Sequence, residues 1–502
     1  MKRRHFCKST VAASIAAAYP FLAACGREPD AGTVDQATNA ADTGISAVSL
    51  DGAEIELEKA AVNELGGALD GTLMLAGHPR YNETRMVWNG MHDKYPALIA
   101  QCATPKDVQE AVTFARERDL LLAVRGGGHS WPGKSVCNGG MMLDLSQMYQ
   151  VDVDTDNEMA FVQGGALLGH LDNATLPLGL VTTAGVVSHT GVGGFTLGGG
   201  FGRLNRKYGL AVDNVRSAEI VTADGQLLTI SEDADRDLFW AIRGGGGNFG
   251  VVTRFDLQLY PFNREVLSGM IMWPVEQARE VLHFYADWHA GLSDELYVGP
   301  VMITMPDGSG SFVGMEVVYN GDPSVGEVEM APLRSFGTPA DDGIAMQDYT
   351  IMQTQEDAAF AHGVRSYIKS GMVQTFTREL ADTIVETFVP DPRLAFFTHT
   401  VGGAAARVDE LATAFPHRNA ETMIMVGGGW MDPADDEWAM STARAWFAEL
   451  APYTGGYYDN IHFDQEAKAG NYGPAQDRLA QIKGQYDPGN LFRMNNNIAP
   501  MS

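Results

Sequence analysis

Residues 124–133, V-R-G-G-G-H-S-W-P-G, constrain the fold of this chain more than any other stretch. Three glycines follow the apolar run Leu120–Val124, so the backbone can turn sharply where a strand is expected to end. Backbone N–H groups in such a turn can contact an anion such as a pyrophosphate, and His129 would stand beside it. A plain strand-to-loop turn with a solvated histidine explains the same residues. The loop alone leaves both readings open.

A second glycine-rich run, residues 185–202, favours the anion site. It reads G-V-V-S-H-T-G-V-G-G-F-T-L-G-G-G-F-G, with seven glycines between Gly191 and Gly202. Its small hydroxyl residues and backbone N–H groups could wrap a diphosphate. Tight turns alone could also explain the run. Two such loops in one chain make a large phosphate-bearing cofactor the better account.

The string Gly245-x-Gly247-x-x-Gly250 has the spacing of a dinucleotide-binding fingerprint but not its context. That fingerprint needs a strand before it and a helix after it, so that the helix N-terminus receives the pyrophosphate. Here a helix is predicted over Asp237–Ile242, and the strand Val251–Leu257 follows. We therefore do not expect a Rossmann site.

The overall charge argues against a nucleic-acid partner. Among 502 residues, 63 acidic side chains outnumber 35 basic ones, giving a formal net charge of −28. A phosphate backbone demands a basic face, and no Lys/Arg run occurs beyond the N-terminus. The expected partner is a small-molecule substrate.

The first 25 residues have the features of an export signal. Arg3-Arg4-His5-Phe6 opens a basic segment that resembles a twin-arginine signal, and the apolar segment Val11–Ala24 is short for a membrane span. Leu22-Ala23-Ala24-Cys25 resembles a lipobox. We expect export to the periplasm or cell surface and a lipid on Cys25 as the only membrane attachment, with an ordinary secretory peptide as the alternative.

Composition and periodicity divide the rest of the chain. A disordered tether is predicted for residues 26–52, an α+β domain rich in glycine loops for 53–262, a second domain for 263–455, and a C-terminal segment for 456–502. The second domain is expected to hold a mainly antiparallel sheet flanked by helices. Helices are predicted at Ala53–Leu65, from Thr104-Pro105, and at Glu276–His289. Strands are predicted at Met141–Leu145, Gly269–Met272, Val301–Met305, Ser311–Val318, Leu394–Thr400 and Thr422–Val426, and Asp224-Gly225 is expected to close a hairpin.

The cysteines give no sign of a metal site. Cys7 lies in the export signal and Cys25 is the expected lipid site, which leaves Cys102 and Cys137 without metal-ligand spacing. Two buried thiols are favoured over a disulfide, although export to an oxidising compartment keeps the disulfide possible. No metal is predicted.

Several motifs together resemble one family. The two glycine loops, K-Y-G-L-A-V-D-N-V and F-W-A-I-R-G-G-G-G-N-F-G-V-V-T are similar to the FAD-binding domain of the PCMH-type (vanillyl-alcohol-oxidase) superfamily. The C-terminal N-Y-G-P-A-Q-D-R-L-A-Q-I-K-G-Q-Y-D-P-G-N-L-F-R-M-N-N-N-I resembles the berberine-bridge-enzyme-like branch. The resemblance runs from about Tyr81 to the end, and it implies a two-part FAD-binding domain with its core at about residues 94–262.

The resemblance implies FAD and a set of residues that hold it. His129 matches the family histidine that bonds to the flavin 8α-methyl carbon, where a neutral imidazole nitrogen would act as nucleophile. Other matching positions would surround the diphosphate, the adenine side or the isoalloxazine ring: Arg125, Gly126, Gly127, Gly128, Ser130, Gly185, Ser188, Thr190, Gly191, Gly194, Val251, Asn495 and Asn497.

The chain departs from the family pattern at three positions. Many relatives carry a second flavin bond from a cysteine, but here Ala184-Gly185-Val186 is followed by Val187, so a single bond through His129 is expected. Many plant relatives place a glutamate on the strand after Pro-His-Arg, and Thr422–Val426 offers no carboxylate. Others use a tyrosine where this chain has Ile461.

The catalytic base must therefore come from elsewhere, if one is needed. Tyr457, Tyr458, His462 and Asp464 lie on the segment expected to pass the flavin. Tyr367 and Lys369 lie in R-S-Y-I-K-S, which resembles a strand of the substrate domain that faces the flavin. His189, in the second glycine loop, is also expected close to the flavin ring. Of these, Tyr458, His462, Tyr367 and His189 are the catalytic candidates, although for each residue alone packing or a solvated surface position is favoured over catalysis.

The resemblance implies an FAD-dependent oxidase, and the N-terminal signal implies that it is exported. A substrate CH–OH or CH–NH group would be oxidised, with O2 as the acceptor. A dehydrogenase that passes electrons to a quinone or a periplasmic carrier is the alternative. A surface binding protein that keeps FAD without catalysis is a remoter one.

Overall fold

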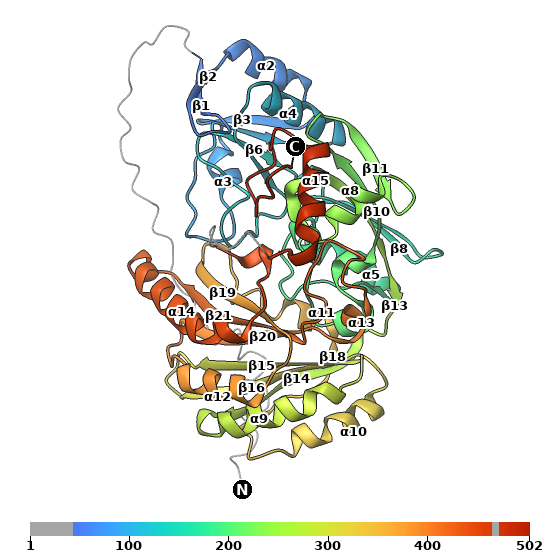
Figure 1. Ribbon diagram of the computed structural model, residues 1–502, viewed down its shortest axis with the longest axis vertical. Helices are drawn as coiled ribbons and strands as arrows, with labels where there is room; N and C mark the ends of the chain where they lie inside the picture. Colours follow the sequence, from blue (N-terminus) through green and yellow to red (C-terminus); the bar gives the residue numbers. More distant parts are fainter. Residues whose placement is uncertain (1–43, 464–470, 502) are drawn as a thin grey trace.

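The computed structural model describes residues 44–463 and 471–501. Two parts lie end to end along the long axis in Figure 1: an N-terminal part built on two small sheets, and a second part built on one large sheet. The C-terminal segment returns to the N-terminal part. The export signal, most of the predicted tether and Asp464 lie outside the described residues.

The first small sheet has the strand order β3-β4-β6-β5. Its strands are β3 (Thr72–Leu75), β4 (Leu98–Gln101), β5 (Leu122–Arg125) and β6 (Met141–Asp144). β4, β6 and β5 run parallel, so their carboxyl ends meet at one edge, and the first glycine loop leaves from β5 at that edge. Helix α4 (Pro105–Glu117) begins where predicted, because the Asp107 N–H donates to the Thr104 hydroxyl at 3.2 Å.

The N-terminal boundary differs from the prediction. Strand β1 (Ile45–Val48), assigned to the tether, pairs antiparallel with β2 (Glu54–Leu57). The helix predicted over Ala53–Leu65 is therefore wrong at its start, and α2 spans Lys59–Ala68. The alternation E-I-E-L has a period of two residues, which is a strand pattern that the helical spacing of later residues obscured.

The second small sheet is antiparallel, with the order β11-β10-β12-β8-β7. Its strands are β7 (Val151–Asp154), β8 (Met159–Gln163), β10 (Val215–Val221), β11 (Leu227–Ser231) and β12 (Val251–Gln258). Gly225 has φ +84° in the turn between β10 and β11, as the predicted hairpin requires.

The helices of the N-terminal part are α3 (Tyr81–Arg85), α5 (Leu168–Thr175), α6 (Val192–Leu197), α7 (Asn205–Tyr208) and α8 (Arg236–Ile242), in addition to α2 and α4. α8 precedes the 245–250 glycines and β12 follows them, which confirms that no Rossmann arrangement is formed.

The large sheet has the order β17-β14-β16-β15-β20-β21-β19, with β18 also paired to β14. Its strands are β14 (Glu265–Pro274), β15 (Leu296–Thr304), β16 (Ser311–Tyr319), β17 (Asp341–Asp342), β18 (Ala345–Asp348), β19 (Arg365–Val373), β20 (Leu394–Thr400) and β21 (Thr422–Trp430). Its strands pair antiparallel, so the predicted mainly antiparallel sheet of the second part is confirmed. The predicted strands fall within or overlap β14, β15, β16, β20 and β21.

Helices cover one face of this large sheet and leave the other toward the N-terminal part (Figure 1). They include α9 (Ala278–Trp288), α10 (Pro323–Arg334), α12 (Arg378–Thr387) and α14 (Asp436–Leu450), which pack on the strands through Trp273, Leu282 and Trp446. Two shorter helices, α11 (Tyr349–Thr354) and α13 (Gly403–Arg407), lie near the junction. The uncovered face therefore meets the glycine loops.

The C-terminal segment joins the two parts. Helix α15 (Gln476–Tyr486) packs on α8, and the buried Lys483 ammonium bonds the Asp487 carboxylate at 2.6 Å and the Asn248 carbonyl at 2.6 Å. The last residues then run back along the 245–250 glycines. This path places Asn495–Asn497 beside the N-terminal part.

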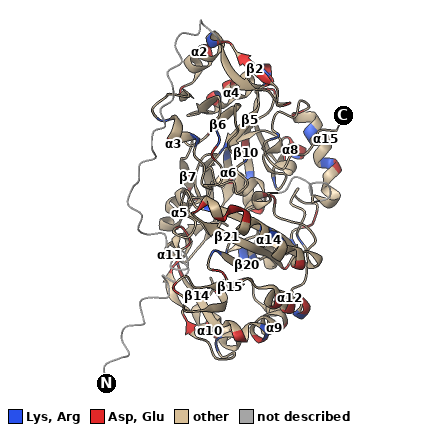
Figure 2. Cartoon of the chain, turned by 90° about the vertical axis from the view of Figure 1, so that its left-hand side faces the viewer, with Lys and Arg blue, Asp and Glu red and all other residues tan. Residues whose placement is uncertain are grey.

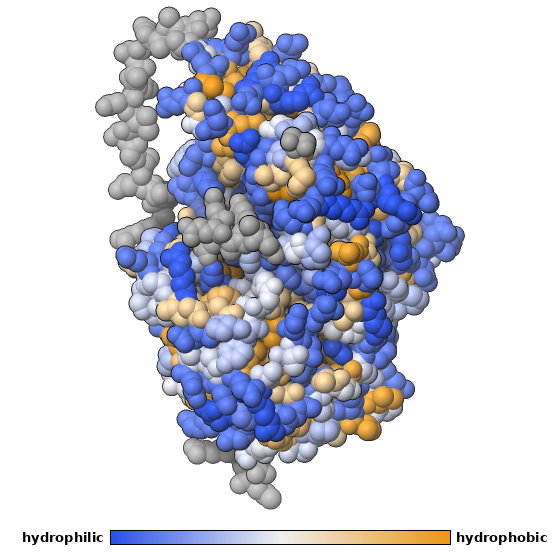
Figure 3. Space-filling view, viewed as in Figure 1, coloured by the Kyte–Doolittle hydropathy of each residue, from blue (hydrophilic) through white to orange (hydrophobic). Residues whose placement is uncertain are grey.

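The face of the molecule seen in Figure 3 is mostly hydrophilic. In Figure 2, blue segments are scattered among tan and red ones, and Figure 3 shows a largely hydrophilic face with small hydrophobic patches. Cys102 and Cys137 are both buried free thiols, which confirms the favoured reading over a disulfide. No helix among the described residues is long and apolar enough to span a bilayer.

Candidate functional site

A cavity of about 320 Å³ lies between the two parts of the molecule. Both glycine loops, the 246–252 segment, the C-terminal segment and the uncovered face of the large sheet contribute to its wall. Many of the residues predicted to hold the cofactor line it: Gly126, Gly127, Gly128, His129, Ser130, Gly185, Thr190, Gly191, Gly194, Val251 and Asn495. The fold thus brings together segments that are far apart in the sequence.

The two glycine loops touch backbone to backbone. A Cβ atom on Gly127 would lie 2.4 Å from the Cα of Gly191, and one on Gly191 would lie 2.3 Å from the Gly127 nitrogen. Gly128 has φ +69°, a conformation that side chains rarely adopt. Only glycine therefore allows the loops to meet, and it leaves backbone groups as part of the cavity wall.

His129 follows directly and lies against an aromatic ring. Its imidazole stacks on the Trp88 indole with 4.3 Å between ring centroids and 12° between planes. Burial, with His189 and His362 nearby, lowers the pKa of His129 to about 3. The ring is therefore neutral at physiological pH and carries a nucleophilic lone pair.

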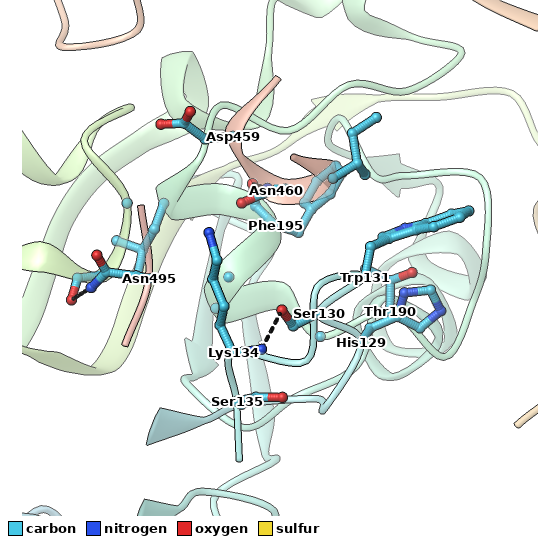
Figure 4. Close-up of a pocket in the computed structure, with 18 of the residues that line it drawn as sticks. His129, Ser130, Trp131, Lys134, Ser135, Thr190, Phe195, Asp459, Asn460 and Asn495 are labelled. Atoms are coloured by element: carbon cyan, nitrogen blue, oxygen red, sulfur yellow. Dashed lines mark hydrogen bonds between the residues drawn. The ribbon is translucent and has the colours of Figure 1, made fainter. Parts of the chain in front are cut away.

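The C-terminal asparagines close the opposite end of the cavity (Figure 4). Asn495 donates to the Gly247 carbonyl at 2.9 Å, and Asn496 donates to the Asp459 carbonyl at 2.6 Å. The Lys134 ammonium bonds the Asn496 side chain. Lys134 and Asn496 both line the cavity, although neither was predicted from the sequence as a site residue.

These features fit the cofactor that the sequence resemblance implies. The Asn495 side-chain oxygen and a His129 ring nitrogen are buried without a hydrogen-bond partner among the described residues. The glycine backbones and the Lys134 cation suit a diphosphate. Unsatisfied buried polar atoms are costly, so a polar ligand that contacts them would stabilise the site.

Three predicted cofactor residues do not line the cavity. Arg125 bonds the Thr84 carbonyl and lies 3.8 Å from the Asp144 carboxylate, which places it beneath the loop. Ser188 donates from its backbone and hydroxyl to Asp357, at 2.8 and 2.5 Å. Asn497 does not line the cavity, whereas its neighbour Asn496 does. Side-chain direction after a turn is not readable from the motif.

Of the four catalytic candidates, Tyr458 alone lines the cavity. Its hydroxyl accepts hydrogen bonds from the Asn460 side chain at 2.7 Å and from the Gly200 N–H at 3.3 Å. Burial raises the pKa of Tyr458. The phenol therefore keeps its proton, and a role as base is disfavoured.

The other three candidates lie away from the cavity wall. The Tyr367 hydroxyl accepts from Arg444 at 3.0 Å on the helix-covered face of the sheet. His462 stacks on Tyr457 with 3.6 Å between centroids. His189 lies behind His129, with 5.0 Å between ring centroids. Strand alternation places Ile368, not Tyr367, at the cavity.

The large sheet supplies a histidine that sequence reasoning missed. His399, on β20, lines the cavity beside Phe397, Met423 and Met425. Two-residue alternation along L-A-F-F-T-H-T puts Phe397 and His399 on one face, and this was the available signal. Asp459 is a carboxylate at the wall, but it is engaged by Asn471 at 2.9 Å and by the Tyr472 hydroxyl. Within residues 44–463 and 471–501, no group of three or more His, Cys, Asp or Glu residues could hold a metal ion.

Two family models match segments of this chain that contribute to the cavity wall. Residues 96–231 match the family described as FAD binding domain, and residues 457–499 match the family described as berberine and berberine like. An FAD-linked oxidoreductase of Dictyostelium discoideum is 30% identical over 449 residues, which cover 88% of this chain and 97% of the relative.

Bacterial proteins are similar over the same length. (R)-6-hydroxynicotine oxidase of Paenarthrobacter nicotinovorans is 30% identical over 455 residues, which cover 86% of this chain and 97% of the relative. The crystal structure of 6-hydroxy-D-nicotine oxidase from Arthrobacter nicotinovorans superposes with a TM-score of 0.79 at 30% identity, covering 86% of this chain and 98% of that one. The similarity thus includes both parts of the fold.

Proposed function

The chain belongs to the berberine-bridge-enzyme-like FAD-dependent oxidoreductases, and from this we propose that it is a small-molecule oxidase whose FAD is bonded to His129. The family and the FAD-binding PCMH-type fold were both predicted from the glycine loops and the C-terminal motif, and both are confirmed. The covalent bond, the acceptor and the cellular location are proposals.

The position of His129 carries the proposal. It lines the cavity immediately after the glycine loop, and its imidazole stays neutral because burial lowers its pKa to about 3. Trp88 fixes the ring plane from one side. A fixed, neutral imidazole is prepared to form a covalent bond without first losing a proton to solvent.

Other residues would hold the cofactor without bonding to it. Bound FAD supplies a two-electron acceptor for a substrate C–H bond. The backbones of Gly127 and Gly191, with Lys134, would hold its diphosphate, and Asn495 would offer an unsatisfied amide oxygen. Val187 lines the cavity where many relatives have a cysteine, which supports a single covalent bond.

Spectroscopy of the purified holoenzyme tests the oxidase proposal. A substrate screen under anaerobic conditions should find a compound that bleaches the visible absorbance of the flavin, because two-electron reduction removes it. Air should then restore the colour rapidly, with formation of hydrogen peroxide. Slow reoxidation by air, with rapid reoxidation by a quinone, would instead establish a dehydrogenase. If no alcohol, amine or sugar bleaches the flavin, the result would favour a binding protein that keeps FAD without catalysis.

We also propose export through the twin-arginine route, with a lipid on Cys25. The support is the Arg3-Arg4 segment and the Leu22–Cys25 motif. Replacing both arginines by lysine should leave the precursor in the cytoplasm. Cys25→Ala should release the exported protein from membranes into the soluble fraction. Membrane attachment that persists in the Cys25→Ala variant would contradict the anchor.

A further inference from the structure

The wall that the large sheet gives to the cavity is almost wholly apolar. Five side chains of this sheet line it: Ile368 from β19, Phe397 and His399 from β20, and Met423 and Met425 from β21. Phe397 lies opposite Met425 and His399 opposite Met423 in the strand register, so these four side chains form one continuous patch. His399 is the only polar member of the five.

The facing wall continues this character. Trp131, Phe201 and Phe360 line the cavity from three loops of the chain. Phe201 stacks with His399 at 6.5 Å between centroids, and Trp131 meets Phe360 edge to face at 5.9 Å. Flat rings and flexible methionines on both sides provide room and surface for a flat apolar body.

We propose that this site takes a flat, apolar molecule that carries a single hydroxyl or amine group, and that His399 accepts the proton from that group. This proposal rests on the oxidase function proposed above. A sugar is disfavoured, because each of its several hydroxyls would lose water without gaining a partner on this wall.

The hydrogen bonding of His399 leaves one ring nitrogen for a ligand. The Tyr297 hydroxyl lies 3.3 Å from the Thr398 carbonyl and 3.3 Å from His399 Nδ1. When the Tyr297 hydroxyl donates its proton to the Thr398 carbonyl, the hydroxyl oxygen can accept a hydrogen bond from His399 Nδ1–H. The proton of the neutral imidazole is then on Nδ1, and Nε2 carries the free lone pair. Nε2 makes no hydrogen bond within the described part of the chain and is not sealed from the cavity.

Tyr297 is thus a positioning residue. It is 1% exposed, belongs to the neighbouring strand β15, and does not line the cavity. Its hydroxyl fixes which nitrogen of His399 carries the proton. Without this hydroxyl, the proton of the neutral imidazole could be on either ring nitrogen. A smaller fraction of the protein molecules would then have an unprotonated Nε2.

Burial and a charged group behind the ring keep the His399 imidazole neutral. Arg203 binds Glu316 at 2.6 Å and lies 3.6 Å from Glu356, and this buried group stands behind Tyr297 and His399. Burial and then the Arg203 charge lower the pKa of His399 to about 4. The imidazole is therefore ready to accept a hydrogen bond at any pH well above 4, where a solvated histidine would be half protonated near 6.5.

The proposed oxidation removes a hydride and a proton from the substrate. The substrate C–H bond breaks and its hydride passes to the FAD of the proposed function. The O–H or N–H proton passes to Nε2 of His399, and a C=O or C=N bond forms. His399 returns the proton to solvent after the product leaves, and O2 removes the two electrons as hydrogen peroxide.

Three variants test the proposal in the holoenzyme. His399→Leu removes the acceptor, His399→Gln keeps an amide that can hydrogen-bond but cannot take a proton, and Tyr297→Phe removes only the positioning hydroxyl. His78→Gln is the matched control, because this histidine does not line the cavity and contacts none of the proposed cofactor or substrate residues. The probes are 4-methoxybenzyl alcohol, benzylamine, glucose and cellobiose, with both flavin bleaching and calorimetric binding as readouts.

We expect the aromatic probes, and not the two sugars, to bind and bleach the flavin. His399→Gln should lower kcat by about 10²–10⁴-fold, the usual contribution of general base catalysis, with little change in binding. His399→Leu should weaken binding as well. Tyr297→Phe should lower kcat by a smaller factor, and His78→Gln should leave it unchanged.

The acid limb of the kcat/KM profile gives a further readout. In the wild-type protein it should fall near pH 4, because neutral His399 is lost only there, and this fall should be absent from His399→Gln. Preferential binding of the sugars, or unchanged kcat in His399→Gln, would overturn the proposal while the flavin still turned over. A flavin that no probe or wider substrate screen reduces would instead contradict the oxidase function itself.

Discussion

The Trp88 indole and the His129 imidazole are stacked, with 4.3 Å between centroids and 12° between planes. Trp88 is fully buried, and its backbone N–H donates to the Gly128 carbonyl at 2.9 Å, so one residue supports both the loop and the histidine. This contact helps to shield the His129 ring from water, and burial lowers its pKa. A solvated histidine, the simpler reading of the sequence, is excluded.

His129→Ala should abolish the covalent flavin. Acid precipitation of the wild-type protein should leave a yellow pellet, and the tryptic peptide containing His129 should carry the mass of FAD. The variant pellet should be colourless, because no neighbouring residue replaces the imidazole at the cavity wall.

His189→Ala is the matched control for this experiment. His189 lies 5.0 Å from His129 but does not line the cavity, so its removal should keep the pellet yellow. A yellow pellet from His129→Ala, or a colourless one from His189→Ala alone, would reassign the attachment point.

Gly127→Ala should separate the two glycine loops. Its Cβ would lie 2.4 Å from the Cα of Gly191, and neither backbone can yield without moving the loop. We expect destabilisation by about 1–3 kcal/mol, as for other overpacked sites, and weaker FAD retention. Thermal unfolding and the flavin-to-protein absorbance ratio measure the two effects.

Gly67→Ala provides the contrast. Gly67 lies in α2, where an added Cβ meets nothing within 4 Å, so this variant should be unchanged or slightly more stable. Equal flavin content in both variants would show that contact between the loops does not control cofactor binding.

Asp172→Asn should alter the pH dependence of stability. Burial raises the pKa of Asp172 to about 7, whereas an unfolded aspartate ionises near 4. The folded protein therefore binds more protons between these values, and its stability falls as the pH rises from about 4 through 7. The asparagine variant should gain Tm relative to the wild type at pH 8.5 and not at pH 4.5.

The exposed Asp156→Asn variant should show no such pH-dependent gain. Differential scanning fluorimetry at the two pH values suffices for the comparison. If Asp172→Asn changes Tm equally at both pH values, ionisation of Asp172 does not influence stability.

Tyr458→Phe should have a small effect on turnover. The Tyr458 hydroxyl accepts from Gly200 and Asn460, and burial raises its pKa, so it keeps its proton. We expect kcat to fall by less than about 10-fold, below the usual effect of removing a general base, with a stability loss of about 1 kcal/mol for the lost hydrogen bonds. A kcat loss above 100-fold would restore Tyr458 as the catalytic base.

Local patterns predicted much of the fold. Thr104-Pro105 begins α4, Leu394–Thr400 is a strand with the predicted bounds, and Asp224-Gly225 closes a hairpin. Each depends on a few consecutive residues, so a short window suffices. The β1–β2 pair escaped because β1 has few distinguishing residues and its partner strand resembled the start of a helix.

The cofactor site was predictable to the level of loops and not of side-chain directions. Glycines 126–128 and His129 are where the motif put them, since backbone geometry demands glycine there. Ser188 and Arg125 lie in the right segments but turn toward Asp357 and Thr84. His399 belongs to no motif, and its place at the cavity depends on how a whole sheet is oriented against the other part.

The return of Asn495 and Asn496 to the cavity makes the cofactor site depend on segments that are synthesised far apart in time. His129 and the glycine loops leave the ribosome long before Asn495 and Asn496 do, yet all of them line the same cavity. A nascent chain that has not reached these asparagines therefore has no closed pocket to offer. Stable cofactor binding must wait for this segment, and a variant that lacks it should lose its flavin colour.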